Sequence, residues 1–154
     1  MAQPPVAKTV LRSLLTLLAI FIFVVAQAGA TGTVRVQQND GSVQTYDDVS
    51  IRVKHNTLRI GSRDQKGVLV IDRAACSYVG ELLRCLPTSF QLVQTGKTKT
   101  IPLINGLVYV NLTDAPQQMS LSSQQMQPHH LMLTLHTLRG TYITVRGRID
   151  VLQP

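Results

Sequence analysis

The chain has 154 residues, of which 15 are lysine or arginine and 8 are aspartate or glutamate, so its formal charge is +7; 44 % of its residues are hydrophobic. This composition excludes a disordered or fibrous protein, and the length suits one domain with its own core. No G-x-S-x-G elbow, Gly-rich phosphate loop or C-x-x-C pair is present, so the sequence predicts no catalytic residues and no cofactor.

The first thirty residues have the three parts of a secretory signal peptide. Lys8 and Arg12 give a positive start, residues 14–26 are almost wholly apolar, and two A-x-A patterns follow. The apolar run is short for a spanning helix, which needs about 20 residues. We predict cleavage after Ala28 or Ala30, with retention as a membrane anchor as the alternative.

Without Lys8 and Arg12, residues 31–154 carry 13 basic and 8 acidic residues, a charge of +5. They contain no second apolar run of spanning length, so we expect a single domain without a transmembrane segment, in the periplasm or outside the cell. The basic residues do not form runs and are not interleaved with aromatic residues, so nucleic acid is not an expected partner.

Alternation of apolar and polar residues with a period of two dominates residues 31–154 and is typical of half-buried strands. Turn signals separate the runs at short intervals, at residues 39–41, His55-Asn56 and residues 138–140. Asn105-Gly106 also has the composition of a type I′ hairpin turn between two strands. About nine or ten short strands result, which predicts an all-β fold, an antiparallel β-sandwich or an open barrel.

Cys76 and Cys85 are the only cysteines, and an even count in an exported chain favours a disulfide. A helix through both would hold them about 13 Å apart, whereas a disulfide needs Cα atoms roughly 4.4–6.8 Å apart. A hairpin with Gly80 and Glu81 in a type II′ turn instead places the two cysteines opposite each other. We therefore predict a hairpin joined by a Cys76–Cys85 disulfide.

Residues 115–128 interrupt the strand pattern with glutamines and serines between two prolines. They predict a long connection, either a plain crossover between sheets with a short strand around Leu121 or a functional loop. Just before it, Asn111-Leu112-Thr113 matches the acceptor pattern for N-glycosylation.

Met126, His129 and His130 combine thioether and imidazole groups, which suit copper or zinc outside the cytoplasm. His129 and His130 face opposite ways on an extended chain, while His130 and His136 stand about 20 Å apart on one strand. A metal-binding or hydrolytic envelope protein that uses residues 114–136 is the alternative hypothesis, although no motif positions a nucleophile with a base and an acid.

The last alternating run, residues 142–151, has the most regular pattern. Ile143 and Val145 share one face, whereas Tyr142, Arg146 and Arg148 share the other and are the first candidates for binding an anionic partner. The sequence as a whole predicts an exported, non-enzymatic β-domain that is a binding or structural component of the cell envelope. Its partner would be an envelope protein, or an anionic surface polymer or lipid.

Overall fold

The computed structural model describes residues 32–61, 67–119 and 123–150, which are almost entirely antiparallel β-structure, as predicted. The leader and the predicted strand around Leu121 lie outside these residues. No helix within them is long and apolar enough to cross a membrane. The elements are β1 (Gly32–Gln37), β2 (Val43–Tyr46), β3 (Ser50–Val53), β4 (Thr57–Gly61), β5 (Gly67–Asp72), the 3-10 turn η1 (Arg73–Ala75), β6 (Cys76–Val79), β7 (Leu82–Cys85), β8 (Ser89–Gln94), β9 (Lys97–Asn111), β10 (Gln117–Gln118), β11 (Gln125–Met126), β12 (His130–Thr137) and β13 (Tyr142–Arg148).

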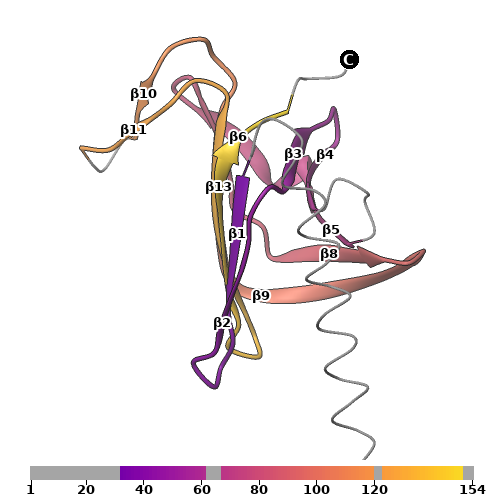
Figure 1. Cartoon of the computed structure of the whole chain (residues 1–154). Helices are drawn as coiled ribbons and strands as arrows, with labels where there is room; N and C mark the ends of the chain where they lie inside the picture. The colour runs from indigo at the N-terminus through magenta and orange to yellow at the C-terminus, as the bar shows by residue number, and fades with distance from the viewer. Residues whose placement is uncertain (1–31, 62–66, 120–122, 151–154) are drawn as a thin grey trace, which may run out of the picture.

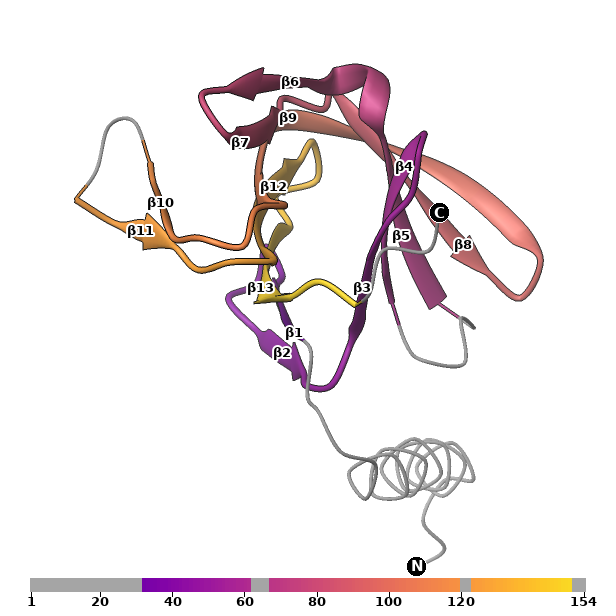
Figure 2. The same ribbon diagram turned by 90° about the horizontal axis from the view of Figure 1, so that it is seen from above.

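Eleven strands form one sheet, with the order β2-β1-β13-β12-β9-β8-β5-β4-β3 and with β7 and β6 attached beside β9. Strand β9 belongs to both halves, because its first part pairs with β8 and its second part with β12 and β7. The sheet curls where β9 crosses from one half to the other (Figure 1). Seen from above, the strands surround a common interior as an open barrel (Figure 2).

The interior is filled by the apolar residues of the period-two pattern. Inward-facing positions alternate with outward-facing ones along each strand, as in Leu131, Leu133 and Leu135 of β12, all at most 1 % exposed. The core takes side chains from both halves of the sheet, so curling is what buries them. Its residues are Val49, Ile51, Val53, Leu58, Ile60, Leu69, Ile71, Leu83, Cys85, Phe90, Leu103, Val108, Val110, Leu131, Leu133, Leu135, Ile143, Val145 and Ile149.

The two ends of the sheet meet along a seam between β1, β3 and the residues after β13. Val49 N donates to the Gly32 carbonyl at 3.0 Å, and Asp150 N donates to the Ile51 carbonyl at 2.7 Å. A Cβ atom on Gly32 would lie 2.6 Å from Ile51 Cδ1, so glycine allows this approach without a shift of the Ile51 side chain. The buried Ser50 hydroxyl donates to Asp150 Oδ2 at 2.6 Å and adds a side-chain link to the seam.

The opposite end of the sheet carries the β1–β2 and β12–β13 turns, both predicted from their Asn, Asp and Gly content. Gly41 and Gly140 have φ angles of 85°, which glycine adopts without strain. Thr141 Oγ1 donates to Gln38 Oε1 at 3.2 Å, so the two turns lie side by side. In the first turn, hydrogen bonds from the Ser42 hydroxyl and amide lower the pKa of Asp40. We call this the turn end of the sheet.

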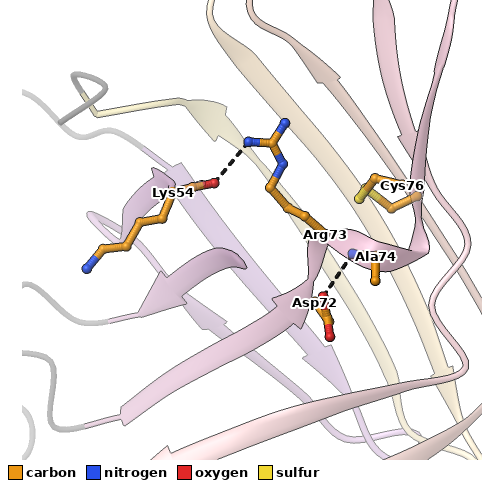
Figure 3. Close-up of a disulfide and its surroundings, with 6 residues drawn as sticks. Lys54, Asp72, Arg73, Ala74 and Cys76 are labelled. Carbon is orange, nitrogen blue, oxygen red and sulfur yellow. Dashed lines mark hydrogen bonds between the residues drawn. A yellow bond between two sulfur atoms is a disulfide. The ribbon is translucent and has the colours of Figure 1, made fainter. Parts of the chain in front are cut away.

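The predicted disulfide hairpin is confirmed, including its register. Cys76 pairs with Cys85 across β6 and β7, their Cα atoms are 3.9 Å apart, and their sulfur atoms are bonded. Gly80 has a φ of 62°, as the first position of a type II′ turn requires. Figure 3 shows how the preceding η1 turn is held: Asp72 caps Ala74 N at 2.8 Å, and Arg73 donates to the Lys54 carbonyl at 3.0 Å.

The prediction of a hairpin turn at Asn105-Gly106 is wrong, because β9 continues through both residues. The strand instead has a bulge, at which the partners of His136 and Thr137 change from Asn105 to Leu103. Gly106 is needed there for space and not for a turn: a Cβ atom would lie 2.9–3.0 Å from Pro87, Leu103 and Leu135. The glycine thus permits close packing where the sheet changes direction.

We predict that the disulfide stabilises the fold but is not required for it. Its loop is short, so a Cys76→Ala/Cys85→Ala variant should lose roughly 2–3 kcal/mol of unfolding free energy, with Tm lower by roughly 10 °C. Thermal unfolding followed by circular dichroism measures this. Reductant should lower the Tm of the parent protein to that of the variant and leave the variant unchanged. Complete unfolding in mild reductant would show that the core alone is insufficient.

Candidate functional site

The outer face of the β1–β13–β12–β9–β7 half carries four arginines from three strands: Arg35 (β1), Arg84 (β7), Arg146 and Arg148 (β13). We call this surface the basic face. Each side chain points outward because its neighbours in the strand, such as Val145 beside Arg146, fill the core. Three of the four are exposed, and Arg84 is half-buried.

The pairing register sets the spacing of these charges. Arg146 and Arg148 lie two residues apart on one strand, about 6.6 Å along it. Arg35 is opposite Thr144, so it is the diagonal neighbour of Arg146 at about 7–8 Å. Arg84 lies in the same cross-strand row as Arg146, three strand spacings away, or roughly 14 Å. The face therefore presents cations over a broad area, with Arg146 close to both Arg35 and Arg148.

Acidic residues are almost absent from the strands. Among the described residues, the strands hold eight lysines and arginines but only one acid, Asp72, at the end of β5. The eight are Arg35, Arg52, Arg59, Arg84, Lys97, Lys99, Arg146 and Arg148. No arginine of the basic face forms an ion pair in the described part of the chain. Its charge is therefore not neutralised by any acid among the described residues.

Arg84 also has an unsatisfied donor. Its Nε atom is buried and has no hydrogen-bond partner among the described residues. In the register it lies between Ser77 of β6 and Tyr109 of β9. A buried donor without a partner is unfavourable, so this side chain has more to gain from an added acceptor than a fully solvated arginine.

Aromatic side chains accompany the arginines. His136 and Tyr142 are opposite each other on β12 and β13, and their rings stack with centroids 3.9 Å apart and planes 12° apart. Tyr109 lies in the row that runs from Arg84 to Arg146. The face thus offers flat, partly apolar surface between its charges.

The structure brings the predicted binding residues Tyr142, Arg146 and Arg148 onto one exposed surface. Arg35 and Arg84 were not predicted, although each has a sequence signal. Arg35 lies in an alternating run, and Arg84 faces Ser77 in the predicted disulfide hairpin. What the sequence lacks is the order of the strands, which places β1 and β7 on either side of β13, β12 and β9.

The predicted long connection links β9 to β12, which are neighbours in the same sheet, so it is not a crossover between sheets. It leaves the sheet as an arm, described over residues 112–119 and 123–129, that contains the small β10–β11 hairpin (Figure 2). Asn111, fully buried at its base, fixes both ends: its Nδ2 lies within 2.9–3.2 Å of the carbonyls of Ala115, Met126 and Gln127. Its Oδ1 accepts from Thr113 N and Oγ1.

Asn111 and Thr113 therefore have a structural use that accounts for the glycosylation pattern. The amide nitrogen that would carry a glycan is buried and already bonded. In the folded state this pattern is an Asx-type turn that anchors the arm, and it does not present an acceptor.

The candidate metal ligands lie at the second end of the same arm. His129, with a left-handed φ of 53°, places Nε2 2.7 Å from Asp114 Oδ1, and His130 Nδ1 lies 2.7 Å from the Pro128 carbonyl. Met126 is buried. Across the described residues, no three His, Cys, Asp or Glu side chains are grouped to hold a metal ion. His136 lies six residues from His130 along β12, so the two rings are about 20 Å apart, as expected for one extended strand.

No protein-family model, curated protein or solved structure matches this chain. Its function must therefore be argued from the basic face and the elements around it.

We predict that Asn111→Asp is strongly destabilising. Aspartate keeps the acceptor for Thr113 but has no N–H to donate, and it places a carboxylate beside three carbonyl oxygens in a buried site. The loss should be about 3–5 kcal/mol, measured as the urea dependence of unfolding. Thr113→Ser keeps the hydroxyl and is the matched control. Equal stability of Asn111→Asp and the parent would contradict the anchoring role.

For the metal hypothesis, we expect copper and zinc to leave Tm unchanged, because among the described residues no third His, Cys, Asp or Glu side chain joins His129 and His130 to complete a ligand set. Calorimetric titration and thermal unfolding with each metal measure this. A rise in Tm that a His129→Gln variant abolishes would instead support the metal-binding alternative.

Proposed function

We propose that this chain is an exported, non-enzymatic binding domain of the cell envelope and that its basic face holds an anionic partner. The observation that carries the proposal is the set of four arginines that form no ion pair with any described residue and lie on strands that have no acid. Arginine suits this role because its planar guanidinium binds carboxylate, sulfate or phosphate oxygens with two parallel hydrogen bonds.

Export is favoured by two independent features. The leader has the pattern of a signal peptide, and the Cys76–Cys85 disulfide is compatible with an oxidising compartment. Binding is favoured over catalysis because the polar groups of the basic face are spread across an open surface of the sheet. Groups that are 7–14 Å apart suit a partner with repeated charges, such as a surface polymer, an acidic protein or a lipid surface.

We predict that Arg146→Gln/Arg148→Gln weakens binding to a polyanion, for which immobilised heparin is the probe. Each lost contact removes about one unit from the slope of log K against log salt, so the slope should fall by about 2. Elution across a salt gradient and binding measured at several salt concentrations report this change.

The matched control is Lys97→Gln/Lys99→Gln, which removes the same charge from the β8–β9 hairpin, outside the basic face. It should leave most of the slope intact. Binding that is unchanged from low to high salt, or that depends more on Lys97 and Lys99, would remove the basic face as the cause.

A further inference from the structure

Exposed large hydrophobic residues are concentrated at one end of the molecule. Seven such residues occur in the described part of the chain, and six of them lie at or next to the turn end of the sheet. These six, which we call the apolar rim, are Val43, Leu86, Ile104, Leu107, Leu138 and Tyr142, each between 39 % and 62 % exposed. Only Tyr78, on β6, lies elsewhere.

The register places the rim residues in adjacent positions. Tyr142 is level with Gln37, the partner of Val43, and with His136, the partner of Asn105. Ile104 is the extra residue of the β9 bulge beside Asn105. These positions therefore form a line across the sheet next to the β12–β13 turn.

The other rim residues extend this line. Leu138 is in the β12–β13 turn, and its N lies 3.4 Å from the Pro102 carbonyl, two residues before Ile104. Leu107 is one cross-strand row above the line. Leu86 follows Cys85, the partner of Val108, and so lies level with Leu107. The rim thus spans the sheet from β2 to β7.

Single exposed hydrophobic residues are common on soluble proteins, but six of them gathered near one end of a sheet are not. Turn tips are usually polar, and Leu138 is the most exposed residue of the rim at 62 %. Within the described residues, no segment of the chain covers the apolar rim.

Cations border the rim. Arg139 is next to Leu138 in the same turn, Arg35 lies one row above Val43, and Arg146 lies one row farther. One described acid, Asp40, lies in the β1–β2 turn. A projecting apolar tip below a belt of arginines is complementary to a lipid surface, which accepts apolar side chains beneath anionic headgroups.

We propose that the turn end docks on a bilayer that contains anionic lipid, with the apolar rim inserted and Arg35, Arg139 and Arg146 bound to headgroups. Leu138 enters deepest because it is at the tip of a turn. Tyr142 is at the level of the headgroups, where tyrosine is favoured because its ring is apolar and its hydroxyl is polar. This inference rests on the proposed function, since it names lipid phosphate as the anion that the basic face binds.

The chain has no tryptophan, so a single introduced tryptophan reports on its own position. In the full-length Leu138→Trp variant, fluorescence should shift to shorter wavelength on phosphatidylcholine vesicles that contain phosphatidylglycerol, and lipids brominated on the acyl chain should quench it. The matched control, Tyr78→Trp, is also exposed but lies outside the rim and should show neither change. Because each signal is local, membrane binding by the leader does not mimic docking of the rim.

The contribution of charged residues to the fluorescence shift is tested in the same Leu138→Trp background. Adding Arg35→Gln/Arg139→Gln to Leu138→Trp should weaken the shift, and adding Asp40→Asn should strengthen it, because Asp40 stays ionised and repels anionic headgroups. Pure phosphatidylcholine should give a smaller shift than the anionic mixture. Far-ultraviolet circular dichroism of each variant confirms that it is folded.

Three outcomes would overturn the inference. The emission of Leu138→Trp is unmoved by anionic vesicles, or Tyr78→Trp responds equally, or the shift occurs without lipid and rises with protein concentration, which would make a second copy the occupant. Heparin binding by Leu138→Trp separates the two proposals. If the variant still binds heparin but does not bind vesicles, the basic face binds a polymer and the rim proposal alone fails.

Discussion

The approach of β1 to β3 at Gly32 and Ile51 closes the sheet, and this closure encloses the core that the two halves of the sheet share. A sheet of this width would otherwise leave one whole face of leucine, isoleucine and valine in water. Glycine at position 32 suits this closure, since a Cβ atom would force the Ile51 side chain to shift. Closure also requires the chain after β13 to reach β3, where Asp150 bonds to Ile51 and Ser50. Packing and hydrogen bonding therefore act at the same place.

Closure also determines what the outer surface can do. With the apolar side chains turned inward, the strands expose arginine, threonine, histidine and tyrosine, while most acids lie in turns and connections. Most of the described basic residues therefore lie in strands, whereas most of the described acidic residues lie in turns and connections. The apolar rim occurs where the turn end meets the basic face, so one end of the molecule combines hydrophobic and cationic character. Neither property alone would distinguish this surface from that of an ordinary soluble domain.

The local features of the fold were predictable, whereas its long-range arrangement was not. Period-two patterns and turn residues predicted the strands around His55-Asn56 and residues 142–148, and geometry predicted the register of Cys76 with Cys85. The prediction of a turn at Asn105-Gly106 was wrong because the same dipeptide occurs in hairpin turns and in tightly packed bulges, and only tertiary contacts decide between the two. The basic face was predicted in part from β13, since strand order is invisible to local patterns. The use of Asn111 as an anchor depends on carbonyls up to 16 residues away.

Strand β9 is shared by both halves of the barrel, and this sharing couples the unfolding of one half to the unfolding of the other. Its residues 97–102 pair with β8, and residues 103–111 pair with β12, so neither half can separate while the other keeps that strand in place. If β9 separates from its partners in one half, the strands of the other half lose the strand with which they pair. The molecule should therefore behave as one cooperative unit, in which amide protons from both halves exchange with solvent through the same rare event.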